Sequence, residues 1–562
     1  MCTKDLQSIP TEPITDPSGG DPFEFLRRKF AEDAKAFGTN PQLEENLAEV
    51  CVRALARNPS KEMIIDHASG RRVMKAGLVL AVALSLAGRW RRRLPGRRIG
   101  VVLPPGIGGT VVNLALVILD KTPVNLNFTI GRAAAQSCIR QSGLETVITA
   151  GRLREKYPDF PWPDDTRDVV DEIAACGKFR IMGRLLSIRL LPVSWLPGWF
   201  RVPRKGGDRE AALLFTSGSS GDPKGVVLTH RNIMANTAQI SKTGILPSGC
   251  SVMACLPIFH SFGFTVTMWY PMISGVTIVS YPSPLETKKL AEIIFSEGVD
   301  VLVGSATFLR PFLKRARPEQ LAGLKFAVAG AERLSDALYR AFMERFGVPI
   351  VQGYGLTETS PVVSINYREG ADGVEKDPEK LGSVGLLLEG LEARIVSVEG
   401  DQDLSLGDTG ILWLRGPNVF GGYLDNEDRT REAIRDGWFI TGDVAHFDAD
   451  GFLYLEGRLS RFSKIGGEMV PHGLIEEQIS RLFGWNDPAE QVCVVLGRPD
   501  EAKGEILVLL TARKVDLADL RIGLRAAQVP NLWIPRVICE VESIPTLATG
   551  KCDLRSCQIL VE

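Results

Sequence analysis

The sequence predicts an α/β protein built from two or more domains. The chain has 562 residues, which is longer than a single ordinary hydrophobic core supports. Short apolar and β-branched runs alternate with stretches of helical periodicity, a pattern that favours parallel strands covered by helices. Apolar residues make up 44% of the chain and charged residues 24%, as in an ordinary soluble globular protein.

The first elements follow from hydrophobic periodicity. Apolar residues recur at helical spacing over Leu43–Arg57, and the stretch from Met63 onward predicts a strand and a hairpin. Ala76–Gly88 is apolar but too short to span a bilayer, and the basic run Arg89–Arg93 follows it at once. We therefore expect a buried helix there.

The next segments predict a strand, a turn and a helix at Ile99–Leu103, Pro104–Gly106 and Val111–Leu119. Thr146–Thr149 is a further β-branched strand candidate. These pieces build a scaffold and indicate no particular chemistry.

Charge and cysteine usage exclude several function classes. A net charge of −1 gives no global basis for nucleic-acid binding. The ten cysteines include no C-x-x-C pair and no clustered Cys/His spacing, which argues against a zinc site and a disulfide framework and favours a reducing cytoplasm. Met1–Gly20 lacks the basic start and apolar core of a signal peptide.

Lys178–Lys205 is a basic segment that interleaves arginines with leucine, tryptophan and phenylalanine and has no acidic residue. One interpretation is peripheral contact with an anionic membrane, on its inner face. The other is a helix packed on the protein with solvated arginines. The sequence leaves both open.

Thr216–Gly225 reads T-S-G-S-S-G-D-P-K-G and follows Ala211–Phe215, a run typical of a buried strand. Its glycines let the backbone approach a ligand, its hydroxyls and amides can donate to phosphate oxygens, and a lysine adds positive charge. This chemistry suits a triphosphate, although no Walker A pattern is present and a plain Gly/Ser surface loop is the alternative. The candidate nucleotide-binding residues here are Thr216, Ser217, Gly218, Ser219, Ser220, Gly221 and Lys224.

The order of these residues resembles the signature loop of the adenylate-forming superfamily, which includes acyl-CoA synthetases, nonribosomal adenylation domains and luciferases. The resemblance implies a large N-terminal AMP-binding domain and a small mobile C-terminal α+β lid. It also implies that the protein uses ATP and Mg²⁺, with Lys224 among the catalytic residues.

Leu256–Gly263 combines one histidine with apolar and aromatic neighbours. By itself His260 is typical of a satisfied, partly buried histidine. The resemblance implies instead that His260, a candidate catalytic residue, and Phe259 line or gate an acyl tunnel. The apolar residues that follow favour a hydrophobic acid as substrate.

Two motifs predict where the nucleotide binds. Val328–Glu332 has the form of a strand that ends in a tight turn, and the resemblance implies that adenine lies against Gly330, Ala331 and Glu332. In Gln352–Thr359, Tyr354 can stack on a base and the hydroxyl of Thr357, also a candidate catalytic group, can reach the α-phosphate. Glu358 is the predicted ligand of Mg²⁺, a cation that prefers hard oxygens. The alternatives are core packing for Tyr354 and a solvated loop acid for Glu358.

Asp436–Asp443 follows, and a carboxylate after a strand can accept hydrogen bonds from both ribose hydroxyls. The resemblance assigns that role to Asp443. Asp450-Gly451 predicts a hairpin turn leading to Arg458, which by resemblance contacts ribose and phosphate.

The resemblance also implies the domain organisation. Met1–Arg458 is the expected large domain, Leu459–Ser460 the hinge and Arg461–Glu562 the lid. Ser460 stands at the pivot, where aspartate or lysine is common, and Gly467 is expected to make room for the arm of a thiol substrate. His472 and Leu474 replace the usual proline and glutamate.

Pro545–Lys551 places a lysine after a glycine turn near the C-terminus. A lone lysine is usually surface charge. The resemblance implies that Lys551 reaches the active site and neutralises charge on the pentacoordinate phosphorus during adenylation.

Three segments narrow the resemblance. Arg461–Val470, Leu256–Gly263 and Tyr281–Leu285 are similar to the synthetase half of bifunctional acyl-ACP synthetase/acylglycerophosphoethanolamine acyltransferases. This implies transfer of a fatty acid to acyl carrier protein. The acyltransferase motif H-x-x-x-x-D is absent from the chain, because no histidine has an aspartate five positions later, so a separate lysophospholipid acyltransferase would be the partner.

Three alternatives stay open at this stage. A long-chain fatty acid–CoA ligase would share the same motifs, with CoA in place of the carrier protein. A non-catalytic acyl or nucleotide binder would keep the fold without the chemistry. A luciferase-like oxygenase would share the first half-reaction.

Overall fold

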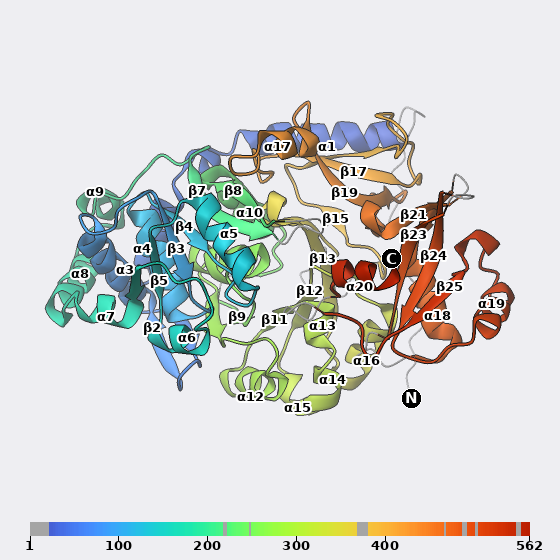
Figure 1. The fold of residues 1–562 in the computed structure, drawn as a ribbon. Helices are drawn as coiled ribbons and strands as arrows, with labels where there is room; N and C mark the ends of the chain where they lie inside the picture. Colours follow the sequence, from blue (N-terminus) through green and yellow to red (C-terminus); the bar gives the residue numbers. More distant parts are fainter. Residues whose placement is uncertain are drawn as a thin grey trace, which may run out of the picture.

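The computed structural model describes residues 22–216, 222–246, 249–367, 380–465, 468–485, 492–500, 504–546 and 552–562. A large N-terminal part contains layered sheets and helices, and a smaller C-terminal domain adjoins it on the right of Figure 1. The predicted α/β class is confirmed. So is the combination of a large domain with a small C-terminal α+β domain.

The first sheet has six strands. Neighbouring strands are parallel except for the antiparallel pair β7 and β8, as the alternation of strands and helices predicts. Its order is β6 (Asp165–Asp168), β5 (Thr146–Thr149), β3 (Arg98–Val102), β4 (Thr122–Asn125), β7 (Glu210–Thr216) and β8 (Lys224–Thr229).

The second sheet has nine strands, and its interior pairings are parallel while its two ends are antiparallel. The antiparallel pair β1 and β2 is the hairpin expected after Met63. The order is β15 (Leu386–Leu387), β14 (Val362–Ile365), β13 (Ile350–Gly355), β12 (Phe326–Ala329), β11 (Val301–Gly304), β9 (Ser251–Ala254), β10 (Thr277–Ser280), β1 (Glu62–Asp66) and β2 (Arg72–Lys75).

Helices cover and separate these sheets. The predicted helices are confirmed as α2, α3 and α4, and α3 is buried along most of its length, as expected. No helix in the described ranges is both long and apolar enough to cross a membrane. The helices of this part are α1 (Pro22–Gly38), α2 (Leu47–Arg57), α3 (Ala76–Trp90), α4 (Ile107–Ile118), α5 (Arg132–Ser142), α6 (Gly151–Lys156), α7 (Val169–Ala174), α8 (Lys178–Leu190), α9 (Leu196–Trp199), α10 (His230–Lys242), α11 (Tyr270–Ser274), α12 (Thr287–Glu297), α13 (Ala306–Leu309), α14 (Phe312–Arg315), α15 (Pro318–Leu321), α16 (Asp336–Phe346) and α17 (Glu427–Ala433).

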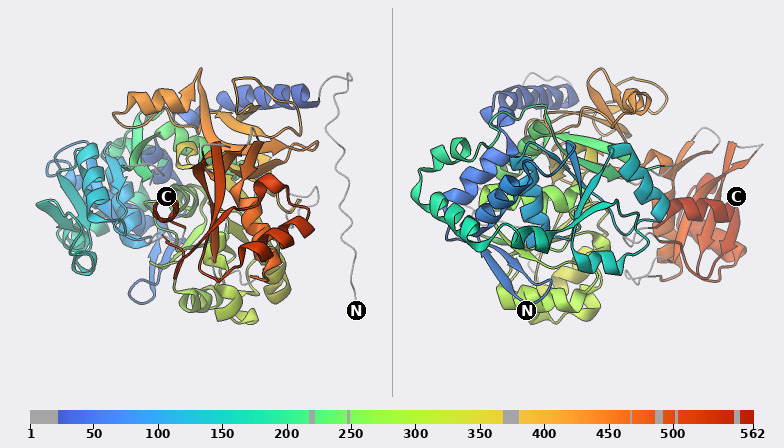
Figure 2. Two further views of the ribbon diagram at one scale, coloured as in Figure 1. Left: turned by 45° about the vertical axis from the view of Figure 1, so that its right-hand side comes forward. Right: turned by 60° about the vertical axis from the view of Figure 1, so that its left-hand side comes forward.

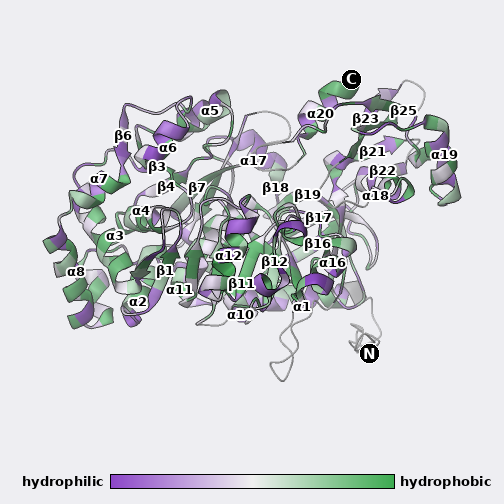
Figure 3. Cartoon of the chain, turned by 90° about the horizontal axis from the view of Figure 1, so that it is seen from below, coloured by the Kyte–Doolittle hydropathy of each residue, from purple (hydrophilic) through white to green (hydrophobic). Residues whose placement is uncertain are grey.

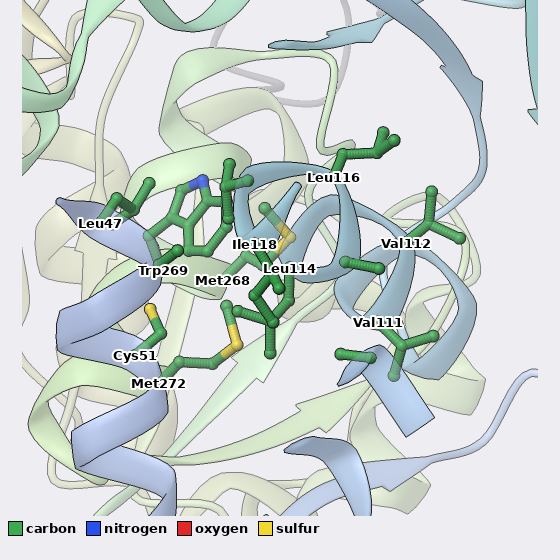
Figure 4. Packing of buried hydrophobic residues seen from close by; sticks show 14 of the residues in the cluster. Leu47, Cys51, Val111, Val112, Leu114, Leu116, Ile118, Met268, Trp269 and Met272 are labelled. Atoms are coloured by element: carbon green, nitrogen blue, oxygen red, sulfur yellow. The ribbon is translucent and has the colours of Figure 1, made fainter. Parts of the chain in front are cut away.

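The hydrophobic core is divided by the sheets because successive strand residues point to opposite faces. Val101 belongs to the core between the two sheets, and its neighbour Val102 belongs to the core on the outer face of the six-stranded sheet. Figure 4 shows part of the inner core, where Trp269 and Met268 pack among side chains of α2 and α4 such as Leu47 and Leu114.

A third, antiparallel sheet follows, made of β16 (Glu392–Val396), β17 (Gly410–Arg415), β19 (Trp438–Phe447), β18 (Ile434–Arg435) and β20 (Leu453–Arg458). The predicted hairpin turn at Asp450-Gly451 is confirmed, since it joins the antiparallel strands β19 and β20. Asp443 was expected after a strand but lies inside β19. The register of β19 on β17 shifts between Ile440 and Val444, and Gly442 has a φ of 72°, so a local bulge rather than a strand end orients this carboxylate.

The C-terminal domain projects from the rest of the molecule in the right-hand view of Figure 2. Its two hydrophobic cores draw only on residues 465–561. It contains β21 (Phe462–Ile465), β22 (Glu468–Pro471), α18 (His472–Leu482), β23 (Cys493–Asp500), β24 (Gly504–Thr511), α19 (Leu517–Ala526), β25 (Val537–Glu540) and α20 (Leu554–Val561).

Candidate active site

A cavity of about 1190 Å³ lies at the carboxyl ends of strands from both large sheets. Thr216 at the end of β7, Gly330 and Ala331 after β12, and Tyr354 near the end of β13 all line it. Ligand sites commonly form outside the carboxyl ends of parallel strands, where loops converge on open space. Most of the predicted site residues that the structure describes therefore face one space, although they come from distant parts of the chain.

The predicted phosphate loop connects β7 to β8, and its two end residues Thr216 and Lys224 are paired across these antiparallel strands. Its central residues Ser217, Gly218, Ser219, Ser220 and Gly221 lie outside the described residues. The Lys224 Nζ lies 5.2 Å from the centroid of the Tyr423 ring, a cation–π distance. The strand pairing thus fixes where the loop begins and ends, with its lysine at the cavity wall.

Asp443 is 4% exposed and is held by two groups. The Tyr354 hydroxyl donates a hydrogen bond to its Oδ2 at 2.5 Å, and the Arg458 Nε lies 3.1 Å from its Oδ1. The Thr441 hydroxyl accepts a hydrogen bond from the Asp443 backbone N–H at 3.0 Å. The four residues form a connected polar cluster: Tyr354, Thr441 and Arg458 line the cavity, and Asp443 lies behind them, outside the lining.

Burial sets the titration behaviour of this cluster. It raises the pKa of Asp443 above its ordinary value, against the opposing effects of Arg458 and the Tyr354 hydroxyl. Burial and the adjacent Asp443 carboxylate also raise the pKa of Tyr354. Tyr354 therefore stays a neutral donor, and Asp443 takes up a proton at higher pH than an ordinary aspartate does.

Glu358 and Tyr423 form a second polar pair. The Tyr423 hydroxyl donates to the Glu358 Oε1 at 2.9 Å, and both residues line the cavity. Burial and the Glu358 carboxylate raise the pKa of Tyr423. The backbone N–H of Phe420 also donates to the Glu358 carbonyl at 2.8 Å, which ties the segment before Tyr423 to the 3₁₀ turn Thr357–Thr359 that follows β13. The neutral Tyr423 hydroxyl thus orients the Glu358 carboxylate at the cavity wall.

Thr357 lines the cavity beside Ser261, and their hydroxyl oxygens lie 3.3 Å apart. Ser261 precedes a π-helical segment, Phe262–Trp269, which carries the apolar residues that follow the predicted His260 motif. Two hydroxyls therefore stand at the junction between the polar cluster and an apolar wall.

The turn after β12 is as tight as the sequence predicts. Ala331 has a φ of 67°, and a Cβ on Gly330 would lie 2.9 Å from the Phe262 ring. Gly330 and Ala331 line the cavity. Glu332 does not line it, because its carboxylate accepts a hydrogen bond from the Thr307 backbone N–H at 2.9 Å.

His260 also lines the cavity, and its side chain is exposed rather than partly buried. Its ring centroid lies 4.8 Å from that of the buried Phe259, which in turn contacts Phe128 edge-on at 5.4 Å. These aromatic contacts hold the imidazole at the cavity wall and leave it accessible.

Beyond the hydroxyl pair, most of the described cavity wall is apolar, with Ser305 as a polar exception. The side chains there belong to the core cluster that joins the nine-stranded sheet to α10 and the π-helical segment. They include Ile240, Leu246, Val266, Val303, Phe308 and Val362.

The C-terminal domain reaches the same cavity through Thr546. Thr546 pairs in an antiparallel bridge with Cys552. Lys551 and Gly467 lie outside the described residues. Ser460 lies in a short 3₁₀ turn, Leu459–Arg461, which connects β20 to the first strand of the C-terminal domain.

The sequence motifs predicted no binding or catalytic function for Tyr423, Ser261 or Thr441. Ser261 lies next to His260 and Thr441 lies two residues before Asp443, so proximity in the sequence was the available signal for them, whereas Tyr423 precedes the Asp436–Asp443 motif. Their contacts with Glu358, Thr357 and Asp443 join segments separated by 65 residues in one case and 96 in another, and such pairings are not visible in a linear pattern.

A family model described as "AMP-binding enzyme" matches residues 53–424, which is more than half of the chain. The chain belongs to the AMP-binding enzyme family. The predicted adenylate-forming superfamily and the enzyme class, an AMP-forming acid–thiol ligase, are thereby confirmed. Members of this family use ATP.

Named relatives are acid–CoA ligases. The chain is 29% identical over 540 residues to "4-coumarate--CoA ligase-like 3" of Oryza sativa subsp. japonica, covering 92% of this chain and 88% of the relative. It is 27% identical to the sulfoacetate–CoA ligase of Cupriavidus necator, covering 86% of this chain and 92% of the relative. It is 30% identical over 361 residues to the long-chain-fatty-acid–CoA ligase of Bacillus subtilis, covering 62% of each.

Solved structures share the fold at lower identity. ATP-bound MatB from Rhodopseudomonas palustris superposes with a TM-score of 0.72 at 23% identity, covering 90% of this chain and 98% of that chain. O-succinylbenzoate CoA synthetase (MenE) from Bacillus subtilis, in complex with ATP and a magnesium ion, gives a TM-score of 0.74 at 21% identity, covering 91% and 99%. These structures confirm that the chain has the predicted two-part α/β fold of adenylate-forming ligases.

Proposed function

We propose that the protein activates a fatty acid with ATP and transfers the acyl group to a phosphopantetheine thiol. In the first half-reaction a carboxylate oxygen attacks the α-phosphorus of ATP, the bond to the bridging oxygen breaks, and acyl-adenylate and pyrophosphate form. In the second, the thiol sulfur attacks the acyl carbon, its proton is released, and AMP leaves. The observation that carries the proposal is one cavity that joins a polar cluster to an apolar wall.

The polar end suits the nucleotide. Lys224, Thr216 and Thr357 would contact the phosphates, since a cation and hydroxyls are good partners for their oxygens. Asp443 would accept hydrogen bonds from the ribose hydroxyls while Arg458, 3.1 Å from it, faces ribose and phosphate. The backbone at Gly330 and Ala331 and the Tyr354 ring would flank adenine.

Glu358 would hold Mg²⁺ together with the phosphate oxygens. The donor set fits this cation, because Mg²⁺ usually binds proteins through one or two carboxylates plus substrate phosphates. The cation would offset phosphate charge during adenylation. The Tyr423 hydroxyl, 2.9 Å from the Glu358 Oε1, keeps the carboxylate oriented.

The apolar wall argues for the body of a hydrophobic acid. A volume of about 1190 Å³ exceeds the ~300–1,000 Å³ typical of a pocket for one small molecule, so ATP and an extended acyl chain fit together. His260 and Ser261 stand near the junction, where the carboxylate would lie. An acid with a charged tail is disfavoured there, because apolar side chains such as Val303 and Phe308 are poor partners for a second charge.

Different observations support two different thiol acceptors, CoA and acyl carrier protein. The named relatives are CoA ligases, which supports CoA. The resemblance of Arg461–Val470, Leu256–Gly263 and Tyr281–Leu285 to acyl-ACP synthetases supports acyl carrier protein, with a separate lysophospholipid acyltransferase downstream. We take CoA as the first acceptor to test, because whole-chain similarity outweighs three short segments.

The two half-reactions would alternate through motion of the C-terminal domain. Met1–Arg458 would act as the large domain, Leu459–Ser460 as the hinge and Arg461–Glu562 as a lid that presents Lys551 for adenylation and Gly467 for thiol transfer. The hydrophobic cores of the C-terminal domain are separate from those of the large domain, which favours movement of the C-terminal domain as a rigid body.

Restricting the hinge tests this domain proposal. Ser460→Pro fixes one backbone angle at the pivot and restricts Leu459 before it. We expect ATP–pyrophosphate exchange to change less than threefold while thioester formation falls about tenfold or more. Ser460→Ala is the matched control and should leave both reactions intact. An equal loss of the two reactions in Ser460→Pro would contradict a hinge at this position.

The activity itself is tested with the purified protein, ATP, Mg²⁺ and labelled palmitate, with CoA and holo-acyl carrier protein offered in parallel. We expect AMP and palmitoyl thioester in equal amounts. 4-Coumarate and sulfoacetate serve as competing acids, and a preference for either of them over palmitate would contradict the fatty-acid proposal. Absence of adenylate with all three acids would support a non-catalytic binder instead.

A further inference from the structure

Helix α8 has two apolar faces, and the protein covers only one of them. Ile181, Leu185 and Ile188 recur at helical spacing and pack against the core that includes α3. At 100° per residue these three side chains share one side of the helix. This face accounts for the folding of α8 onto the domain.

The opposite face is apolar and exposed. Phe179, Met182, Leu186 and Leu190 follow each other at intervals of three and four residues, so they lie in one stripe. Their side chains are 96%, 58%, 57% and 71% exposed. Isolated exposed apolar residues are ordinary on a protein surface, but a contiguous stripe marks a surface that contacts something.

Two exposed tryptophans follow α8 along the chain. Trp195 ends the short turn η2 (Val193–Trp195), Trp199 ends α9, and each is 65% exposed. Tryptophan combines a large apolar ring with a polar N–H, which suits the boundary between hydrocarbon and water. Figure 1 shows α8 and α9 at the end of the molecule away from the C-terminal domain, and Figure 3 shows hydrophobic stretches on α8 at this outer end.

Positive charge lies on both sides of the stripe. Helical geometry puts Arg180 on one flank and Lys178 and Arg189 on the other, all exposed. Residues 178–205 contain seven lysines and arginines and no acidic residue. Burial and the nearby positive charges of Arg180 and Arg91 lower the pKa of Arg184. The surface is therefore a concentrated positive field around an apolar strip.

We propose that α8, η2 and α9 form a docking surface for the anionic face of a lipid bilayer. The apolar stripe would enter the boundary between headgroups and acyl chains, with the helix parallel to the membrane plane. The arginines would contact the anionic headgroups, which attract basic residues near the surface. A repeating anionic surface suits positive charge on both flanks of the stripe better than a single protein partner does. This proposal does not depend on the proposed reaction.

The test is flotation of the purified full chain with vesicles of phosphatidylcholine alone and of phosphatidylcholine with phosphatidylglycerol, without ATP. We expect the wild-type protein to float with the anionic vesicles and to bind the neutral ones at least about a hundredfold more weakly, because several basic residues contribute roughly 1 kcal/mol each near an anionic surface. The triple variant Phe179→Ser/Leu186→Ser/Leu190→Ser should bind at least about a hundredfold more weakly, because each lost side chain removes substantial apolar burial. These side chains are exposed, so the fold should tolerate the changes.

The variant Arg180→Gln/Arg189→Gln isolates the charge. Each lysine or arginine near an anionic surface contributes roughly 1 kcal/mol, so about thirtyfold weaker binding to anionic vesicles is expected. Binding to neutral vesicles should change less than threefold. Unchanged binding to anionic vesicles would overturn the electrostatic basis of the proposal.

Two matched controls separate this surface from general effects. Ile522→Ser/Ile559→Ser removes side chains that are 67% and 66% exposed on α19 and α20. Arg140→Gln/Lys288→Gln removes exposed positive charges elsewhere. Both controls should bind vesicles like the wild type.

Two further results would overturn the proposal. One is no wild-type binding to either vesicle type. The other is a dimer by light scattering that the triple serine variant dissociates while vesicle binding is unchanged, which would assign the stripe to a second copy of this chain. Parallel ATP–pyrophosphate exchange should stay near wild type in every variant, which keeps this test distinct from that of the proposed reaction.

Discussion

The two ends of the cavity are built on opposite principles. At the polar end, each functional group is fixed by a named partner, as Asp443 is by Tyr354 and Arg458, and Glu358 is by Tyr423. At the apolar end, side chains such as Leu246 and Val303 are continuous with the core and have only packing contacts to define them. Charged groups need preorganised partners in a buried site, whereas an acyl chain needs only dry volume of the right shape.

Because of this difference, the two ends of the cavity should tolerate amino-acid substitutions differently. Removing a partner at the polar end leaves a buried charge or hydroxyl unsatisfied, which is costly. Changing a side chain at the apolar end alters volume, and neighbouring side chains can partly adjust. We therefore expect mutations at the polar end to impair catalysis with every acid, and mutations at the apolar end to change which acid is used.

The largest expected effect is that of Lys551→Ala. The proposed function puts the Lys551 charge at the reacting phosphate, and loss of one such preorganised charge should reduce adenylation about 100-fold or more. ATP–pyrophosphate exchange with palmitate measures this step directly, and Lys514→Ala, a lysine elsewhere in the C-terminal domain, is the control. Exchange at the wild-type rate in Lys551→Ala would contradict the proposed role of this residue in adenylation.

Asp443→Asn should have the next largest effect. The substitution keeps the shape but removes the charge that faces Arg458, and hydrogen bonds to charged groups contribute about 1.5–3 kcal/mol. We expect the KM for ATP to rise about tenfold to a hundredfold, with the KM for the acid nearly constant. Steady-state kinetics with ATP as the varied substrate measures this KM.

The control for this variant is Glu392→Gln, which neutralises a carboxylate paired with Arg415 in the same antiparallel sheet. It should leave the KM for ATP unchanged. If Asp443→Asn instead raised the KM for palmitate alone, the two ends of the cavity would have been assigned the wrong way round.

Leu246→Trp tests the apolar end. Leu246 is 5% exposed and lines the cavity, so a larger ring there should fill space that a long chain needs. We expect kcat/KM for palmitate to fall about tenfold, since one or two methylenes in a tight pocket are worth 10–200-fold, while a shorter acid such as octanoate is spared. Leu246→Met conserves volume and should change neither substrate's kcat/KM by more than twofold.

A uniform loss with all acids in Leu246→Trp, accompanied by a raised KM for ATP, would break the separation between the two ends. Thermal unfolding of this variant distinguishes that result from general destabilisation, because overpacking a core costs about 1–3 kcal/mol.

The smallest expected effect is a pH dependence of ATP binding. Burial raises the pKa of Asp443, so its carboxylate becomes protonated, and a poorer acceptor, at higher pH than an ordinary aspartate. The KM for ATP should therefore rise severalfold as the pH falls toward that raised pKa and level off above it. Asp443→Asn should show a flat profile over the same range. An identical profile in the two proteins would assign the dependence to another group.

The sequence predicted the fold class and the motifs because both depend on local patterns. A run of β-branched residues identified strand β5 at its observed bounds, Thr146–Thr149, and the helical spacing after Leu43 identified α2. Glycines marked turns where backbone geometry demands them, as at Gly451, whose φ is 79°. The order of the nucleotide-binding motifs along the chain predicted the adenylate-forming superfamily, and the family match confirms this prediction.

Side-chain partnerships were decided only by the tertiary structure. The sequence grouped Glu332 with the adenine site, but its carboxylate accepts the Thr307 N–H outside the cavity lining. It gave no role to Tyr423, which reaches Glu358 across 65 residues. Likewise it could not say which face of Lys178–Lys205 packs inward, since both faces of α8 are apolar and helical periodicity alone does not choose between them. Local sequence sets backbone preference, whereas contacts between distant segments depend on how the layers pack, and that packing placed polar partners at one end of the cavity and core side chains at the other.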